Sequence, residues 1–195
     1  MNHALSSIRR TFVRFFICCI YLWGSLWYDK DYLVGKHFDR QHFSDGWKWI
    51  LRYWFGQKVL GKNRHVPWPC PADVHIASPK NIVFDPDDMH SINSSGAYFQ
   101  GIDATISIGY GTEISLNTGF ITANHDMRSE GRCHLQGKPI VIGDCSWVGM
   151  NAVILPGVTL GAHTVVGAGA IVTKSFPEGH CVIAGNPARK IKDLE

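Results

Sequence analysis

The chain has 195 residues, of which 45% are apolar and 18% charged, and this composition is typical of a folded protein rather than a disordered one. Its formal charge of +3 arises at the N-terminal end, because residues 1–60 hold nine Lys/Arg against four Asp/Glu and the remaining 135 hold ten against twelve. This mild excess excludes a nucleic-acid-binding function, which requires a concentrated basic stripe. Because the six cysteines show no CxxC spacing, we expect a cytoplasmic protein rather than a disulfide scaffold.

Residues 1–65 form an aromatic, basic segment for which the sequence predicts two helices, over 9–28 and 45–61. In the second helix the apolar residues recur at the helical spacing, and Asp45 is expected to cap its start. The residues expected on its apolar face are Trp47, Ile50, Leu51 and Trp54. The uncharged run 15–28 has fourteen residues, whereas a spanning helix needs about 17 to 25, and no signal-peptide cleavage site follows it.

Two interpretations of residues 8–60 remain open. These residues either pack on a partner subunit or on the main domain, or they make a peripheral contact with the inner face of the cell membrane. Three prolines in the stretch "VPWPCP", residues 66–71, then break helical structure. We therefore predict a domain boundary between residues 65 and 66, a main domain over 66–180 and a C-terminal tail over 181–195.

In the main domain, aliphatic side chains recur every six residues, a period that fits neither an α-helix nor a hairpin strand. These aliphatic residues are Ile142, Val148, Ile154, Leu160, Val166 and Val172. Four positions after the first five of them stand short side chains, namely Ser146, Ala152, Val158, Thr164 and Ala170. The alternation predicts an all-β domain shaped as a three-sided prism, in which successive coils stack as parallel strands about 4.8 Å apart. The pairs expected to stack are Ile142 with Leu160, Val148 with Val166, and Ile154 with Val172.

An earlier set keeps the same period, at Ile102, Ile108, Ile114 and Phe120, and a fainter one begins at Ile76 and Ile82. The gap of twenty-two residues from Phe120 to Ile142 is not a multiple of six. A segment must therefore leave the prism, and the polar stretch 123–138 is predicted to be a projecting loop. Loops held by a rigid scaffold are common places for functional residues.

Three motifs in the same order resemble the hexapeptide-repeat acyltransferases, in the branch of maltose, galactoside and polysaccharide O-acetyltransferases. They are "TANHD" at 122–126, the repeat array that begins "GKPIVIGDCSWVGM" at 137, and "VIAGNPARKI" near the C-terminus. The resemblance covers about residues 100–192 and implies a left-handed parallel β-helix. It also implies a homotrimer, with acetyl-CoA lying along the coils and the acceptor near the projecting loop.

Within this resemblance His125 matches the catalytic histidine. Transfer to a hydroxyl needs a base, because an alcohol is almost fully protonated at neutral pH, and imidazole exchanges protons in that range. Asp126 is expected to orient the imidazole or to contact the acceptor, and Asn117 and Asn124 to donate hydrogen bonds in the cleft. Each of the three also fits a turn position.

The acetyl donor is expected along the repeat array. Trp147 matches a tryptophan near the pantetheine arm, and the N–H of Gly149 is the expected donor to the oxyanion. Gly167 and Ala168 present little side chain, so they allow the ligand to approach closely. Lys174, Arg189 and Lys190 match positions that hold the coenzyme A phosphates.

The sequence thus predicts an O-acetyltransferase that acts on a hydroxyl of a sugar or a surface polysaccharide precursor. Alternatives on the same scaffold are a serine, a xenobiotic or an amino-sugar N-acyltransferase, and a purely structural β-helix. We expect no metal site, since the histidines do not match the zinc-binding spacing of the related γ-class carbonic anhydrases. The histidines considered are His125, His134, His163 and His180.

Overall fold

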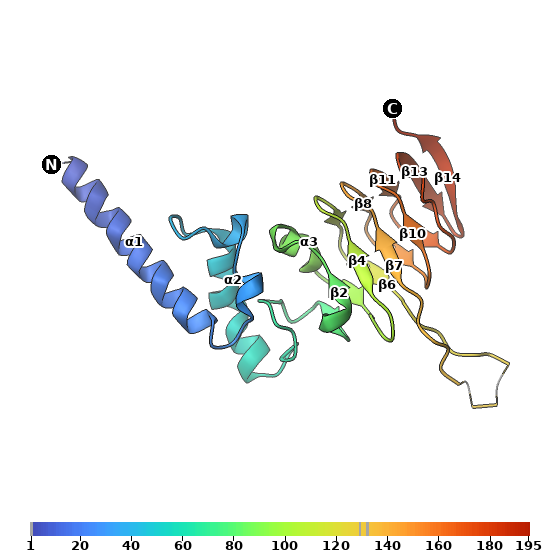
Figure 1. The fold of residues 1–195 in the computed structure, drawn as a ribbon, viewed down its shortest axis with the longest axis horizontal. Coiled ribbons are helices and arrows are strands. Elements are labelled where there is room, and N and C mark those ends of the chain that lie inside the picture. The colour runs from blue at the N-terminus through green and yellow to red at the C-terminus, as the bar shows by residue number, and fades with distance from the viewer. Residues whose placement is uncertain (1, 129, 132) are drawn as a thin grey trace. The chain divides into compact units, whose positions relative to one another are not determined.

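The computed structural model describes residues 2–128, 130–131 and 133–195, with side chains from residue 9 onward. The chain divides into two compact units, residues 1–72 and 73–195. The first is helical and the second is built from short strands (Figure 1). The structural division falls after residue 72, and the domain boundary expected between residues 65 and 66 remains a prediction.

The helical unit contains α1 (Asn2–Gly24) and α2 (Asp45–Trp54), followed by a π-helical turn, η3 (Phe55–Val59). Short 3-10 turns, η1 (Lys30–Tyr32) and η2 (Lys36–Phe38), connect the two α-helices. The helices pack closely, because a Cβ at Gly24 would lie only 2.8 Å from the Cδ1 of Ile50. Helices are present in both predicted segments, but α1 ends at Gly24 rather than at residue 28, and the second segment continues after Trp54 only as the π-helical turn η3, before the prolines of 66–71.

Two details of the second helix differ from expectation. Trp47 and Ile50 are fully buried, but Leu51 is 46% exposed, so the predicted apolar face holds only in part. Ser44 is the N-cap residue, and Asp45 is the first helical residue, so the predicted cap is wrong. The Asp45 carboxylate instead accepts from Lys48 Nζ at 2.9 Å, one turn further on.

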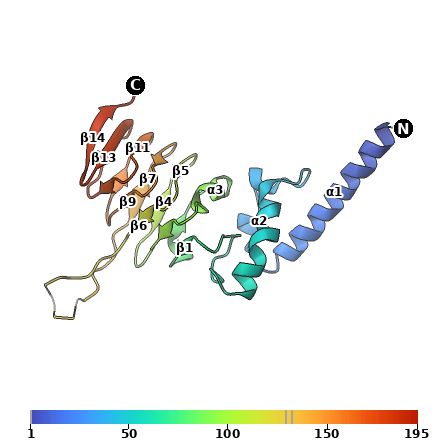
Figure 2. The ribbon, with the colours of Figure 1, turned by 180° about the vertical axis from the view of Figure 1, so that it is seen from behind.

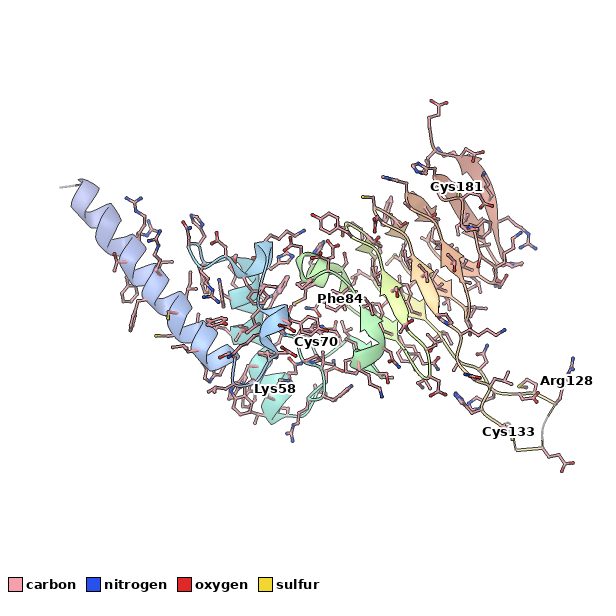
Figure 3. The ribbon with its side chains drawn as sticks, in the orientation of Figure 1. Lys58, Cys70, Phe84, Arg128, Cys133 and Cys181 are labelled. Carbon is pink, nitrogen blue, oxygen red and sulfur yellow. The ribbon has the colours of Figure 1, made fainter. Side chains whose placement is uncertain are left out.

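A buried amide holds the stretch 66–71 against the helices. Gln57 Oε1 accepts from the Tyr28 hydroxyl at 3.0 Å and from the Cys70 N–H at 3.1 Å. Gln57 Nε2 lies within 3.2 Å of the carbonyl oxygens of Asn63, Val66 and Trp68. Lys58 and Cys70 also lie in this region (Figure 3), and the Lys58 ammonium donates to the Val66 carbonyl at 2.9 Å. One glutamine thus satisfies backbone groups that the prolines leave without helical partners.

No helix in the described part of the chain combines the length and the apolar character needed to cross a bilayer.

The second unit is a parallel β-helix whose described strands form three sheets. The first sheet contains β1 (His75–Ile76), β3 (Tyr98–Phe99), β6 (Gly119–Phe120), β9 (Val153–Ile154) and β12 (Ile171–Val172). The second contains β2 (Ile82–Val83), β4 (Ile106–Ile108), β7 (Ile140–Ile142) and β10 (Thr159–Leu160). The third contains β5 (Glu113–Ile114), β8 (Trp147–Val148), β11 (Thr164–Val166), β13 (Cys181–Gly185) and β14 (Ala188–Asp193). Helical turns η4 (Pro79–Asn81), η5 (Pro86–Asp88) and α3 (Met89–Ile92) interrupt the early coils.

The stacking predicted from the period of six is confirmed. Ile142 pairs with Leu160, Val148 with Val166, and Ile154 with Val172, all in parallel register. These six side chains are at most 1% exposed, and the short residues between them are at most 2% exposed. Large and small inward residues therefore fill the narrow prism, as the sequence indicated.

The earlier array departs from the period at Ile102. Ile108, Ile114 and Phe120 lie in register with the next coil, whereas Ile102 lies outside the strands and is half-buried. Extra residues separate β3 from β4, so the position that stacks on Phe120 falls on Phe99, which is fully buried, rather than on Ile102. The prediction for Ile102 as a stacking residue is wrong, and its side chain instead lines a cleft.

Residues 123–138 leave the prism between β6 and β7, as predicted, and Figures 1 and 2 show this loop projecting from the stack. Arg128 and Cys133 lie far out on it (Figure 3). The residues predicted as a C-terminal tail form a hairpin. Its first strand, β13, continues the third sheet in parallel with β11, and β14 runs antiparallel to β13.

Candidate active site

His125 lines a cleft of about 520 Å³ at the root of the projecting loop. The cleft lies where β3 and β6 end and their chains turn outward. Its lining consists of Gln100, Ile102, Asp103, Ile121, Ala123, Asn124, His125 and His134. The walls therefore combine apolar side chains with imidazole, carboxamide and carboxylate groups, which is the mixture expected of a small-molecule site.

The backbone that leads to His125 is fixed to the coil beneath it. Gln100 Oε1 accepts from the N–H groups of both Thr122 and Ala123, at 2.9 and 2.8 Å. The buried Thr122 hydroxyl donates to the Ile102 carbonyl at 2.9 Å. These hydrogen bonds hold Thr122 and Ala123, the latter two residues before His125. They therefore fix the point at which the loop that carries His125 leaves the prism.

The two limbs of the loop pair with each other near the cleft. The N–H of Asp126 donates to the Cys133 carbonyl at 2.7 Å, and the N–H of Leu135 donates to the Asn124 carbonyl at 2.9 Å. This antiparallel pairing places His125 opposite His134. Their rings meet edge to face, with centroids 6.1 Å apart and an interplanar angle of 75°.

Asp103 completes this group from an earlier coil. One of its carboxylate oxygens lies 2.6 Å from His134 Nε2, and both side chains are partly exposed. Asp103 has a φ of 57°, in the left-handed region that few residues other than glycine adopt. The cleft thus holds two imidazoles, one of them paired with a carboxylate.

The expected acceptor contacts are only partly brought together. Asn124 lines the cleft beside His125. The Asp126 carboxylate accepts from the N–H of Arg128 at 2.9 Å, which is a turn contact. Asn117 lies at the corner before β6, with a φ of 56°, and its amide oxygen occupies the space that a Cβ of Gly96 would take. The roles of Asn117 and Asp126 in acceptor binding stay predictions.

Trp147 lies on the outer side of the third sheet, in a separate cleft of about 440 Å³. Its side chain is 54% exposed, and its Nε1 donates to the Ser115 hydroxyl at 3.2 Å. The same cleft is lined by Gly111, Glu113, Ile114, Ser115, Cys145 and Ser146. An exposed indole held in place by a hydrogen bond offers a flat apolar surface for a ligand.

The small residues near Trp147 are needed by the coil itself. The N–H of Gly149 donates to the Val166 carbonyl at 2.8 Å, so our expectation that it is a free oxyanion donor is wrong for this structure. A Cβ at Gly149 would lie 2.7 Å from the Ala168 nitrogen, and one at Gly167 would lie 2.9 Å from the Ala184 Cβ. The two glycines permit the coils to stack, and Ala168 is exposed beside them.

The three expected phosphate-binding cations are exposed near the C-terminal end of the array. The Lys174 ammonium lies 5.4 Å from the centroid of the Phe176 ring. Arg189 and Lys190 are neighbours on β14. Lys190 forms an ion pair with Asp193, and this hydrogen bond raises the pKa of Lys190. An anion at Lys190 would therefore compete with a carboxylate already in contact.

Known proteins share both the sequence pattern and the fold. The bacterial transferase hexapeptide (six repeats) family matches residues 139–174. The galactoside O-acetyltransferase of Escherichia coli is 39% identical over 94 residues, which are 47% of this chain and 46% of that protein. A galactoside acetyltransferase solved with coenzyme A is 30% identical, with a TM-score of 0.54 over 66% of this chain and 62% of that one. A hexapeptide-repeat containing acetyltransferase from Vibrio cholerae is 30% identical, with a TM-score of 0.52 over 65% of this chain and 70% of that one.

The chain belongs to the hexapeptide-repeat acetyltransferases. The resemblance seen in the sequence is thereby confirmed, and the second unit is the predicted left-handed parallel β-helix. The chain spans about half the length of the curated relatives it matches, such as a putative acetyltransferase from Schizosaccharomyces pombe, of which it covers 45%.

The sequence did not predict that Asp103 lines the cleft, nor that His134 pairs with it and faces His125. The position of His134 could have been predicted. A loop that leaves the prism and returns to it has two limbs that face each other, so a residue near its end lies opposite one near its start. The position of Asp103 could not, since it depends on the residues added between β3 and β4. Among the residues that the structure describes, no group of His, Cys, Asp or Glu is arranged to hold a metal ion.

Proposed function

We propose that this protein transfers an acetyl group from acetyl-CoA to a hydroxyl of a sugar or of a surface polysaccharide precursor. The observation that carries the proposal is His125 at the root of a braced loop, beside a cleft of about 520 Å³. Support comes from relatives of the same family, among them a galactoside O-acetyltransferase and an enzyme solved with acetyl-CoA. The latter is 30% identical over 65% of this chain, with a TM-score of 0.52.

In this proposal His125 is the general base. Its imidazole removes the proton of the acceptor hydroxyl as the oxygen attacks the thioester carbonyl. The carbon–sulfur bond then breaks, the acetyl group remains on the acceptor oxygen, and the proton passes from the imidazolium to the departing thiolate. Asn124 and the Asp103–His134 pair supply hydrogen bonds to the acceptor in the same cleft.

We further propose that the active unit is a homotrimer. His125 lies between the first and second sheets, whereas Trp147 lies on the third, and the two clefts share no lining residue. One chain therefore does not bring both clefts to one point, but a neighbouring chain can supply the face that the first one lacks. The donor would extend from Trp147 along Gly149, Gly167 and Ala168 towards the exposed cations Lys174 and Arg189, with Lys190 after it releases Asp193.

An acceptor screen with labelled acetyl-CoA tests the reaction. We expect labelled esters on sugar hydroxyls, and His125→Ala should lower the rate about 100- to 10,000-fold without changing the circular dichroism spectrum. Labelling confined to amines would replace O-transfer by N-acyl transfer. Absence of labelling with every acceptor, in the wild type as in the variant, would favour a structural β-helix.

We also propose a location in the cytoplasm at the inner face of the membrane, with residues 8–60 in peripheral contact with lipid. No disulfide joins the cysteines in the described part of the chain, which is compatible with a reducing compartment. A membrane location would bring the cleft to acceptors that are assembled on lipid carriers.

A further inference from the structure

One face of α1 presents apolar side chains to solvent. We define the apolar stripe as Phe12, Phe15, Cys19 and Leu22, whose spacing places them on a single side of the helix. Phe12, Phe15 and Leu22 are 70%, 67% and 59% exposed. The opposite side of α1 is buried in the unit through Ile17 and Ile20. The stripe is therefore not needed for the fold of this unit.

The exposed apolar surface continues past the end of α1. We define the aromatic edge as Leu26, Trp27 and Phe55, which are 76%, 44% and 56% exposed. Trp54 connects the two helices here, with its ring centroid 5.6 Å from that of Trp27 and 6.5 Å from that of Phe55. Exposed tryptophan and phenylalanine of this kind suit the boundary between lipid headgroups and acyl chains.

The basic and acidic residues of the unit lie in different segments. Residues 2–28 and 46–72 contain eight Lys/Arg and no Asp/Glu, whereas all four acidic residues of the unit lie in 29–45. Arg9, Arg10 and Arg14 are exposed on the first half of α1. The segments that present apolar side chains are thus purely cationic, which complements anionic headgroups. A second copy of the same surface would be repelled.

We infer that the apolar stripe and the aromatic edge dock on an anionic lipid bilayer, with α1 lying in the plane of the interface. This inference specifies the membrane contact proposed above and rests on it. The 23-residue helix binds without crossing, since its arginines remain at the headgroups while the stripe enters the acyl boundary.

Vesicle flotation of the full chain tests the inference. We expect binding to vesicles of phosphatidylcholine with phosphatidylglycerol, little binding to phosphatidylcholine alone, and weaker binding as salt is raised. Replacing Arg9, Arg10 and Arg14 together by Gln should weaken binding about a hundredfold, since each cation near the surface contributes about 1 kcal/mol. Phe15→Gln should also weaken it.

The matched control is Val83→Gln, which changes a side chain that is 53% exposed on β2 in the other unit and should leave flotation unchanged. Equal flotation of the wild type and Phe15→Gln, or none for either, would overturn the inference. Self-association that Phe15→Gln abolishes, without vesicle binding, would show that a second copy covers the stripe. Acetyl transfer to a free sugar, assayed without vesicles, tests the proposed function separately.

Discussion

His134 Nε2 lies 2.6 Å from a carboxylate oxygen of Asp103, which precedes it by 31 residues, beside the cleft that contains His125. In the proposed reaction an acceptor hydroxyl approaches His125, and this pair fixes a second imidazole, His134, beside it. We therefore assign the pair to acceptor positioning rather than to proton removal.

Asp103→Asn should raise the KM for the acceptor about tenfold, because a hydrogen bond to a charged group contributes about 1.5–3 kcal/mol. The KM for acetyl-CoA should stay unchanged. The Asp39–His42 pair has the same 2.6 Å separation in the helical unit, so Asp39→Asn is a matched control that should leave both constants unchanged. Steady-state kinetics with each substrate varied in turn would measure this, and an equal rise in both constants for Asp103→Asn would contradict it.

Gly143→Ala should destabilise the β-helix by about 2 kcal/mol through overpacking. A Cβ at Gly143 would lie 2.4 Å from the Ala162 nitrogen, and this backbone atom of the next coil cannot move aside without disturbing the stack. Gly119→Ala is the comparison, since a Cβ there would make only an ordinary contact of 3.6 Å with Val153. Urea unfolding followed by circular dichroism should separate the two variants, and equal midpoints would refute the steric explanation.

Gln57→Leu should destabilise the helical unit by about 3 kcal/mol, because it leaves the buried Tyr28 hydroxyl and the Cys70 N–H without their acceptor. Six of the seven tryptophans lie in residues 1–72, so indole fluorescence reports mainly on this unit. Unfolding by this signal should shift to lower denaturant in the variant. An unchanged midpoint would show that water replaces the amide at no cost.

Tyr28 should make the helical unit less stable in alkali. Burial, together with the charge of Cys70, raises the pKa of Tyr28 well above its usual value of 10.0. Once the pH exceeds about 10, the unfolded chain loses this proton while the folded chain keeps it, so the free energy of unfolding falls as the pH rises. Tyr28→Phe should be less stable at neutral pH but show a shallower decline above pH 10. Parallel curves for the two proteins would disprove the assignment.

The repeat array was predictable in detail because a period of six fixes which side chains point inward. Ile142 and Leu160 had to stack once that period was recognised, and they do. Ile102 was assigned wrongly because the added residues between β3 and β4 shift the register, and short apolar runs do not reveal such insertions. Ser and Asp are both favourable N-cap residues, so residue type alone does not decide whether Ser44 or Asp45 is the cap. The backbone conformation decides it in favour of Ser44.

The site was predictable only where a local motif carried it. His125 stands in "TANHD", so this local motif was enough to select it from the sequence, and its role as the base stays a prediction. Asp103 and His134 meet through tertiary structure, one from an irregular coil and the other from the returning limb of the loop. The Gly149 N–H donates to the Val166 carbonyl of the next coil. Such a partner can be assigned only when the relative positions of the coils are known.

The direction of β14 has a consequence for how the protein behaves at high concentration. A stack of parallel coils ends in strands whose backbone N–H and C=O groups are unpaired. Another molecule can pair with these edges, and repeated pairing would form a fibre. On the third sheet the final strand runs opposite to its neighbour β13, so an incoming coil would meet a mismatched edge there. We therefore expect the β13–β14 hairpin to hinder end-to-end association on the third sheet, and deletion of residues 186–195 should increase aggregation measured by light scattering.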